Sequence, residues 1–216
     1  MMPPEPAPKP PASLLIDNDA FVLLAAADHL SAAIAALGFT IDQCRILPTL
    51  THVFRKRIAK KFSPEMADRI QAEIAKFKPL ETEPSAAAIK RFDGQADIDP
   101  GEVVLFADLS ERSTSLLTTN DKRALRAVSA ITDPADARSS IAGRVVCVEA
   151  LIRKLVVAHT VAVVGPGFST VAAFNSAMAV CFSPTCLADQ DQCLAALDGY
   201  IKEITGQCGA DFFYTL

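Results

Sequence analysis

Three acidic residues lie at the ends of short apolar segments, where their carboxyl groups can meet. Asp17 ends the segment SLLID, Asp121 follows the segment SLLTT, and Glu102 lies near the start of a helix predicted for DPGEVVLFADL. If the two segments are parallel strands, their carboxyl ends share the edge of the sheet at which open α/β folds bind ligands. Carboxylates gathered there repel one another unless a divalent cation neutralises them, and ligand sets made only of oxygen suit Mg²⁺ or Mn²⁺. Such an ion acidifies a bound water and stabilises a phosphate under attack, so these acids are the candidate metal ligands and catalytic groups.

Each acid also has a structural interpretation. Asn120 is a good N-cap for the helix after SLLTT, which would place Asp121 in the first turn, where a carboxylate favours the helix dipole. Glu102 fits a capping box with Asp99. Asp17 is harder to explain in this way, because an acid that ends a buried strand has no capping task.

Asp19 is expected to cap the helix that follows Asp17, with a supporting contact to the metal ligands as the alternative. The segment RKRIAKK usually indicates a solvated face, but in an acidic chain it is the best candidate for contacting phosphates. Lys122 and Arg123 are next to Asp121 and could add to this surface. The basic residues of the segment are Arg55, Lys56, Arg57, Lys60 and Lys61.

The elements that must position these residues alternate along the chain. Short apolar runs at 13–17, 44–47, 115–119 and 144–148 predict strands, and segments with helical periodicity lie between them. Such alternation favours a parallel sheet covered on both faces. We therefore expect an α/β fold, a three-layer α/β/α sandwich with a mainly parallel sheet in which these four strands lie side by side.

Several helices are predicted more closely. Residues 20–38 are expected to form one buried helix closed by a glycine, residues 51–62 a basic helix, and Ser63 with Pro64 the start of another helix. The segment 78–85 is interpreted as a break, and VGPGFST (164–170) as a turn, because it lacks the Gly-Lys-Ser/Thr of a phosphate loop. The last fifty residues are expected to be helical.

Length and composition limit the remaining possibilities. The 216 residues suit one domain or one domain with an extension, and the formal net charge of −4 disfavours binding of nucleic acid by bulk charge alone. Residues 1–12 are a proline-rich tail that cannot pack a core, 13–165 are expected to be the α/β domain, and 166–216 a C-terminal helical extension packed on it.

The six cysteines show no CxxC motif and no Cys/His ligand spacing, so we expect free thiols, although Cys181, Cys186 and Cys193 could in principle form a bridge or bind metal. No secretory signal is convincing, and no apolar run reaches the length of a membrane span. These features predict a soluble, cytoplasmic protein.

Three motifs together resemble the PIN-domain family of metal-dependent nucleases. LLIDNDAF, IDPGEVVLFA and LLTTNDKRALRAV follow one another in the order and spacing of that family's acidic motifs, over about residues 13–160. The resemblance implies a three-layer α/β/α fold and cleavage of RNA with Mg²⁺ or Mn²⁺. It makes Asp17 the first, Glu102 the third and Asp121 the fourth of four acids, with Thr119 and Asn120 flanking the site. Many family members are toxins of toxin–antitoxin pairs, so the resemblance implies an antitoxin-like protein partner. A homodimer is a separate expectation.

The chain departs from the family pattern at the second acid. The segment ILPTLTHVFRKRIAKKF holds no carboxylate, so Thr51, His52 or the later Glu65 would have to take that place. This departure supports an alternative, a catalytically degenerate PIN-like binding or scaffold protein. A further alternative follows from DNDAFV, which is similar to the nucleophile motif of haloacid-dehalogenase-type phosphatases, with Asp17 attacking phosphate and Asp19 as the acid.

Overall fold

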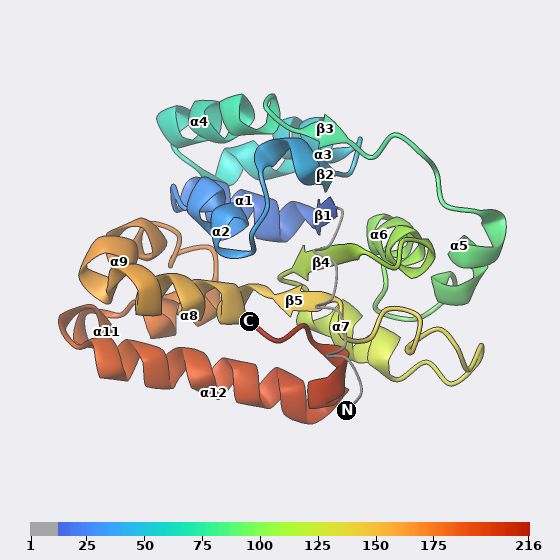
Figure 1. Ribbon diagram of the computed structural model, residues 1–216. Helices are drawn as coiled ribbons and strands as arrows, with labels where there is room; N and C mark the ends of the chain where they lie inside the picture. The colour runs from blue at the N-terminus through green and yellow to red at the C-terminus, as the bar shows by residue number, and fades with distance from the viewer. Residues whose placement is uncertain (1–12) are drawn as a thin grey trace, which may run out of the picture.

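A five-stranded, all-parallel sheet forms the centre of the molecule, with strand order β3-β2-β1-β4-β5 (Figure 1). The computed structural model describes residues 13–216, so the prediction for the proline-rich tail, 1–12, lies outside the described residues. The strands are β1 (Ser13–Ile16), β2 (Cys44–Ile46), β3 (Lys78–Pro79), β4 (Ser115–Thr119) and β5 (Val145–Cys147).

Two hydrophobic cores lie on opposite faces of the sheet, because side chains alternate along each strand. Leu14 and Ile16 pack into one core and Leu15 into the other. The first core is covered by α1 (Asn18–Ala26), α2 (Leu30–Ala36), α3 (Leu50–Val53), α4 (Pro64–Ile74), α8 (Val148–His159), α9 (Val161–Ser169), α10 (Ser176–Cys181) and α11 (Pro184–Ala188). The second is covered by α5 (Ala86–Phe92), α6 (Pro100–Glu111) and α7 (Lys122–Ser129). Most helices of the first set lie left of the sheet in Figure 1 and the second set lies right of it. The predicted three-layer α/β/α sandwich is confirmed.

The four predicted strands are confirmed as neighbours, whereas β3 was missed. It is an edge strand of two residues in the segment that we interpreted as a break, and it pairs with β2 through Arg45–Lys78 and Ile46–Pro79. A proline is tolerated there because the edge of a sheet needs no donor on its outer side. Two residues are too few to give a periodic signal, so the sequence could not show this strand.

The single helix predicted over 20–38 is wrong, because the chain breaks between α1 and α2. Asp28 has a φ of 62°, and the two helix axes differ by 116°. His29 then turns towards α9, where its ring stacks on Phe168 with centroids 5.1 Å apart and its Nε2 lies 2.9 Å from the carbonyl oxygen of Val164. The break therefore depends on packing with a distant helix rather than on a local signal.

The turn predicted for VGPGFST is also wrong, because most of this segment belongs to α9, which contains Pro166. Gly167 faces the break after α1: a Cβ atom at this position would lie 2.1 Å from the carbonyl oxygen of Ala27. Glycine is needed here because the backbones of α9 and of the α1–α2 connection approach so closely.

The predicted basic helix is helical but irregular. It consists of α3, a π-helical segment Phe54–Ile58 and a 3₁₀ segment Ala59–Lys61. The helix starting at Ser63 and Pro64 is confirmed as α4, with the Ser63 hydroxyl accepting from the Met66 amide.

Helices also dominate the last fifty residues, as predicted. The long helix α12 (Gln190–Cys208) buries Leu197 and Ile204 and contributes to both cores. The boundary expected at 165/166 falls inside α9.

All six cysteines are free thiols and buried, as expected. Within residues 13–216, no single helix is long and apolar enough to cross a membrane; α1 and α2 meet the criteria of length and composition only as a sharply bent pair.

Candidate active site

The order in which the chain adds strands to the sheet reverses between β1 and β4, and the carboxyl ends of these two strands lie next to each other. From β1 the chain proceeds to β2 and β3 on one side, and it then returns to β4 on the other side of β1. Open α/β folds bind their ligands at such a switch point. Asp17 directly follows β1, and its amide donates to the carbonyl of Thr118 at 3.0 Å, so the first predicted ligand lies at this switch point.

Asp17 occupies the N-cap position of α1, yet its side chain makes no capping bond. Instead, its Oδ2 accepts a hydrogen bond of 3.0 Å from the Thr119 hydroxyl. The side chain is almost fully buried, and this burial, with the nearby charge of Asp19, raises the pKa of Asp17 to about 7. The expectation that Asp17 has no capping task is confirmed.

Glu102 has the structural role that the sequence predicted. Its Oε2 accepts from the Asp99 amide at 2.7 Å, and the Asp99 carboxylate accepts from the Glu102 amide at 2.9 Å, which together form a capping box. Glu102 is also buried, and burial raises its pKa to about 8, with smaller contributions from the negative charges of Asp121 and Asp17. The helix cap therefore holds Glu102 in the electrostatic field of the other two acids.

Asp121, rather than Asn120, is the N-cap of α7, so this part of the prediction is wrong. Its Oδ1 accepts from the amides of Arg123 and Ala124 at 2.8 and 3.0 Å, and its Oδ2 lies 3.3 Å from the Arg123 guanidinium. The Asp121 amide donates to the Thr119 hydroxyl at 3.1 Å, a turn that connects the end of β4 to the cap of α7. Capping of α7 and the ion pair with Arg123 are therefore enough to explain why an aspartate occupies position 121.

Thr119 connects two of the three acids. Its hydroxyl donates to Asp17 and accepts from the amide of Asp121, so it fixes the position of the first acid relative to the segment that carries the other. Its place beside the acids was implied by the resemblance alone. The β-sheet register explains it, because Ile16 pairs with Thr118, so Thr119 lies beside Asp17, the residue that follows β1.

Asp19 and Asn120 lie beside this group. Asp19 is in the first turn of α1 and is not its cap, so the capping prediction is wrong. Burial, followed by the charge of Asp121, raises the pKa of Asp19, and the Lys61 ammonium opposes this effect. The side-chain oxygen of Asn120 is buried without a partner among the described residues. Both residues line a surface hollow of about 360 Å³ that also reaches Asp121 and Arg123.

The acids do not form a ready-made metal centre. Within residues 13–216, no group of three or more Asp, Glu, His or Cys side chains is arranged to hold a metal ion. The donor chemistry nevertheless fits Mg²⁺ or Mn²⁺, because all three ligands are carboxylates and the negative charge of Asp121 contributes to the raised pKa values of Asp17 and Glu102, a repulsion that a cation would relieve. Thr51, His52 and Glu65, the replacements considered for the second acid, are not among the residues lining the neighbouring hollows.

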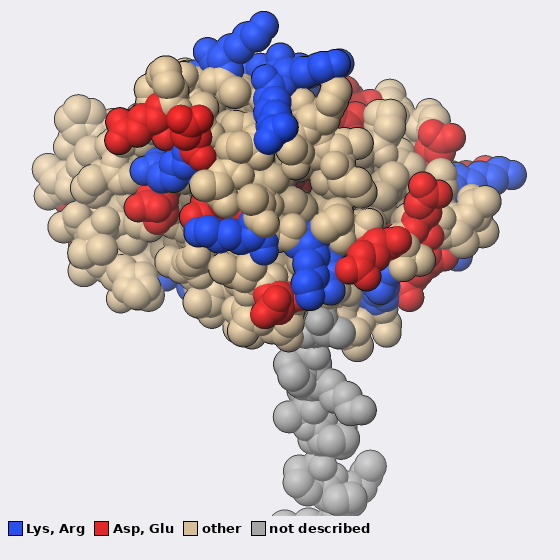
Figure 2. All heavy atoms as spheres, turned by 90° about the horizontal axis from the view of Figure 1, so that it is seen from above, with Lys and Arg blue, Asp and Glu red and all other residues tan. Residues whose placement is uncertain are grey.

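The predicted phosphate-binding residues fall into two groups. The five basic residues of 55–61 are all exposed, and Lys61 lines a small hollow together with Asp19 and Asn120. Figure 2 shows Lys and Arg side chains gathered along one side of the face that carries α4 and β3, with mixed charge elsewhere. By contrast, Lys122 forms an ion pair with the buried Glu149, and Arg123 pairs with Asp121.

Three residues near the site were missed by the sequence analysis. Phe174 is 47% exposed, and its ring meets Phe62 edge-on with centroids 4.9 Å apart. Phe174 and Tyr200 line the hollow beside Asp121, and the buried Glu149 neutralises Lys122 after β5. Phe174 and Tyr200 carry no local signal, because each reaches the site from a distant segment. Glu149 could have been found as an acid immediately after a predicted strand.

Comparison of the chain with protein-family models, with curated proteins and with solved structures gave no significant match. The likeness to the PIN-domain family therefore rests on the three quoted motifs, and it stays a prediction.

The raised pKa values lead to a prediction about stability. A carboxyl group whose pKa is higher in the folded than in the unfolded state stabilises the fold at low pH, and this contribution is lost as the pH rises through the folded value. Without divalent ions, Asp17→Asn should therefore have little effect at pH 4 and raise the free energy of unfolding by a few kcal/mol at pH 8. Urea denaturation at both pH values measures this, with the exposed Asp68→Asn as the control. Equal effects of Asp17→Asn at the two pH values would contradict the assigned burial.

Proposed function

We propose that the protein is a metal-dependent ribonuclease that hydrolyses RNA phosphodiester bonds at the edge formed by Asp17, Glu102 and Asp121. The observation that carries the proposal is Asp17, a buried acid at the switch point with a pKa of about 7 and no helix-capping bond. A buried acid that costs stability at neutral pH and has no structural task is typical of a functional site.

Asp17, Glu102 and Asp121 would hold the ion. When bound, Mg²⁺ or Mn²⁺ supplies an acidified water and offsets charge on the phosphate. Because burial raises the pKa of Asp17 and of Glu102, both must lose a proton before they can act as ligands, so metal affinity should rise between about pH 6 and pH 8. Thr119 keeps the Oδ2 atom of Asp17 in one position during this change.

The capping bonds of two of the acids imply a weak site in the free protein. One carboxylate oxygen of Asp121 accepts hydrogen bonds from backbone amides, and the other forms an ion pair with Arg123. One carboxylate oxygen of Glu102 accepts a hydrogen bond from the Asp99 amide. Fewer available charged ligands weaken binding of a divalent ion. Phosphate oxygens of the substrate would complete the ligand set, so ion and RNA should bind with positive coupling.

Substrate contacts are supported by the surface next to the acids. The exposed basic residues of the segment 55–61 can follow a phosphate backbone. The half-exposed ring of Phe174 lines the same hollow as Lys61 and Asn120, and it offers a surface on which an unpaired base can stack. The choice of RNA over DNA comes from the resemblance to the PIN-domain family. The antitoxin-like partner and the homodimer stay predictions.

A catalytically degenerate binding protein is the second candidate. It is favoured by one observation, the lack of a preformed group of metal ligands within residues 13–216. The phosphatase alternative has less support, because Lys122 pairs with Glu149 rather than with Asp17, and Thr118 packs on the opposite face of the sheet from Thr119.

The test is cleavage of a labelled single-stranded RNA by the full chain. We expect cleavage with Mn²⁺ or Mg²⁺, none after chelation, and binding that weakens steeply as salt rises. A duplex RNA of the same sequence has no unpaired bases, so comparing it with the single strand tests whether stacking of an unpaired base contributes to binding. Binding of RNA without cleavage under any metal condition would favour the degenerate protein.

A further inference from the structure

Apart from the proposed metal ligands, two acids are buried among residues 13–216, and each is paired with a base. Asp108 is 2% exposed and accepts from the Nε of Arg112 at 2.8 Å. Glu149 is 1% exposed and forms an ion pair with the Nζ of Lys122. A buried ion pair is weak evidence for stability, because apolar residues of similar volume often stabilise a fold at least as well. Each pair therefore needs a further explanation.

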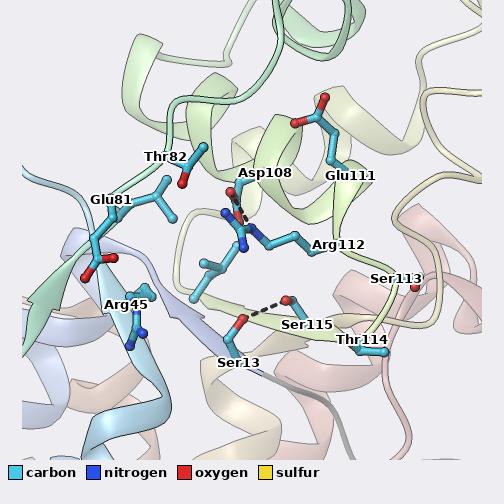
Figure 3. A pocket seen from close by; sticks show the side chains of 12 residues that line it. Ser13, Arg45, Glu81, Thr82, Asp108, Glu111, Arg112, Ser113, Thr114 and Ser115 are labelled. Atoms are coloured by element: carbon cyan, nitrogen blue, oxygen red, sulfur yellow. Dashed lines mark hydrogen bonds and ion pairs between the residues drawn. The ribbon is translucent and has the colours of Figure 1, made fainter.

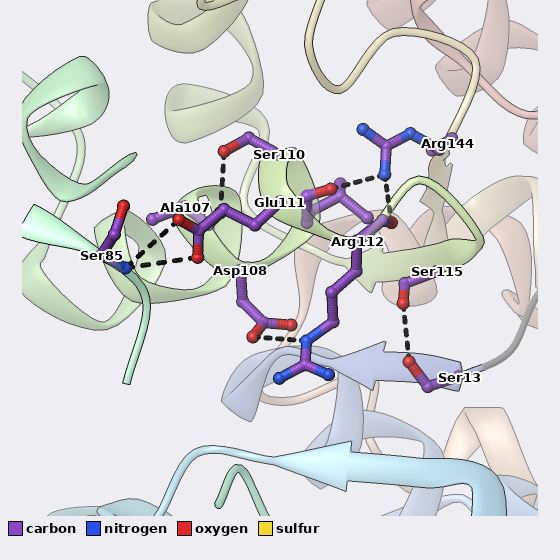
Figure 4. Close-up of polar contacts among 10 residues, drawn as sticks. Ser13, Ser85, Ala107, Asp108, Ser110, Glu111, Arg112, Ser115 and Arg144 are labelled. Atoms are coloured by element: carbon purple, nitrogen blue, oxygen red, sulfur yellow. Dashed lines mark hydrogen bonds and ion pairs between the residues drawn. The ribbon is translucent and has the colours of Figure 1, made fainter. Parts of the chain in front are cut away.

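The Asp108 pair is explained by the end of α6. It lies beside a hollow of about 430 Å³ at the amino ends of the strands, on the edge of the sheet opposite to the metal ligands (Figure 3). Arg112 follows Asp108 by one helical turn, and Arg144 donates to the carbonyl oxygens of Leu109 and Arg112 (Figure 4). The last carbonyl groups of a helix have no partner within it, so these contacts give the pair a structural task.

The Glu149 pair lies instead at the edge of the sheet that carries the metal ligands. Glu149 is in the first turn of α8, directly after β5, and Cys147 of β5 pairs with Thr119 of β4. Lys122 follows Asp121, which already caps α7 with its own carboxylate. The pair is therefore not needed to complete the start of α7, and it brings a second charged residue to the edge beside Asp121.

The Lys122 side chain borders the hollow of about 360 Å³ that also reaches Asp121. Tyr200 lines the same hollow, and the Nζ of Lys122 lies 5.4 Å from the centroid of the Tyr200 ring. The side chain of Lys122 is 23% exposed, whereas that of Arg123 is 73% exposed. The ammonium is thus held between the buried carboxylate of Glu149 and an aromatic ring that borders the hollow.

A lysine held in this way differs from the lysines of the segment 55–61. Those are exposed, so they lose side-chain freedom when they bind a phosphate, and salt screens their charge. The ammonium of Lys122 is already ordered and is largely withdrawn from water, which strengthens its interaction with a nearby anion. Because Glu149 balances its charge, the effect of Lys122 depends on where the ammonium lies rather than on net charge.

We propose that Lys122 donates to a non-bridging oxygen of the phosphate that is cleaved, and that Glu149 and Tyr200 are positioning residues for its ammonium. Given the proposed nuclease function, on which this role rests, Lys122 acts in the reaction rather than in general binding of the RNA backbone. Its ammonium offsets the negative charge that develops on the phosphate during attack. The exposed basic residues of 55–61 supply the affinity for the backbone and its dependence on salt.

The first test separates the rate of cleavage from the affinity for RNA. Single-turnover cleavage of a labelled single-stranded RNA at saturating Mn²⁺ gives the maximal rate and the protein concentration at half of that rate. The double variant Lys122→Met with Glu149→Leu replaces the pair by apolar side chains of similar size, so it should fold. Its maximal rate should fall by about a hundredfold, with little change in the half-maximal concentration. Lys56→Met, at an exposed position of the basic segment, should mainly weaken binding and reduce its dependence on salt.

Glu149→Gln separates the position of the ammonium from its charge. The variant makes the surroundings of the hollow one charge more positive, so charge alone would give tighter binding of RNA and cleavage at least as fast as in the natural chain. The positioning role predicts a maximal rate that is lower by about tenfold, because Lys122 is no longer fixed. Glu203→Gln is the matched control: Glu203 lines the same hollow and pairs with Arg126 at the surface, so its variant should not cleave more slowly.

Binding of a non-cleavable RNA gives a readout that needs neither cleavage nor a variant with altered folding. In nitrogen NMR spectra of the lysine ammonium groups, the Lys122 signal, identified by its loss in the double variant, should shift when this RNA is added with Mn²⁺. An unshifted signal with RNA bound, a folded double variant that cleaves at the natural rate, or faster cleavage by Glu149→Gln would overturn the role of Lys122 and leave the nuclease function in place. A natural chain that neither binds nor cleaves RNA would overturn the nuclease function, and this role with it.

Discussion

Asp17→Asn should abolish metal-dependent RNA cleavage while leaving the protein folded. The amide keeps the size of the side chain and can still accept from the Thr119 hydroxyl, but it cannot carry the charge that a divalent ion requires. If the ion contributes about 4 kcal/mol to transition-state stabilisation, the rate falls by roughly a thousandfold. The measurement is the initial rate of cleavage of a labelled single-stranded RNA at saturating Mn²⁺.

The matched control is Asp68→Asn, which makes the same change at an exposed position of α4. It should cleave at the natural rate. Because Asp17→Asn also relieves the burial of a charge, the inactive variant should be the more stable one at pH 8, which is the trade-off expected of a functional residue. An Asp17→Asn variant that cleaves as fast as the control would remove Asp17 from the mechanism.

Gly167→Ala should be among the most destabilising single substitutions in the chain. The added Cβ would lie 2.1 Å from the carbonyl oxygen of Ala27 and 2.9 Å from the His29 ring, so backbone as well as a side chain must move. Overpacking of this kind lowers the free energy of unfolding by about 3 kcal/mol or more. Chemical denaturation measures the change.

Gly199→Ala is the control for Gly167→Ala. Gly199 lies within α12 with nothing within 4 Å of the added Cβ, so alanine should stabilise the protein by up to about 1 kcal/mol through helix propensity. A Gly167→Ala variant as stable as the natural chain, or more stable, would mean that α9 does not approach the α1–α2 connection as described.

The features that the sequence predicted correctly are those set by local chemistry. The four predicted strands are short, mainly apolar runs, and the capping box of Asp99 and Glu102 needs only residues three positions apart. Asp17 was singled out because a carboxylate at the end of a buried strand has no local purpose. In each case the physical cause lies within a few residues of the signal.

The features that the sequence missed depend on contacts between distant segments. The α1–α2 break is fixed by His29 and Gly167, which come together only in the folded chain. Asn120 and Asp121 are equally good caps by residue type, so the sequence could not show that Asp121 is the one that accepts from the α7 amides. Phe174 reaches the acid group from the loop after α9, a position that no pattern in the sequence indicates.

Titration of the full chain with Mn²⁺, with and without a non-cleavable RNA, tests the central claim most directly. The account predicts weak, roughly millimolar binding in the free protein, because two of the three acids are engaged in helix caps. It predicts clearly tighter binding with RNA, whose phosphate oxygens complete the ligand set, and loss of this coupling in Asp17→Asn. Failure of Mn²⁺ to bind under either condition, or coupling that survives in Asp17→Asn, would contradict the account.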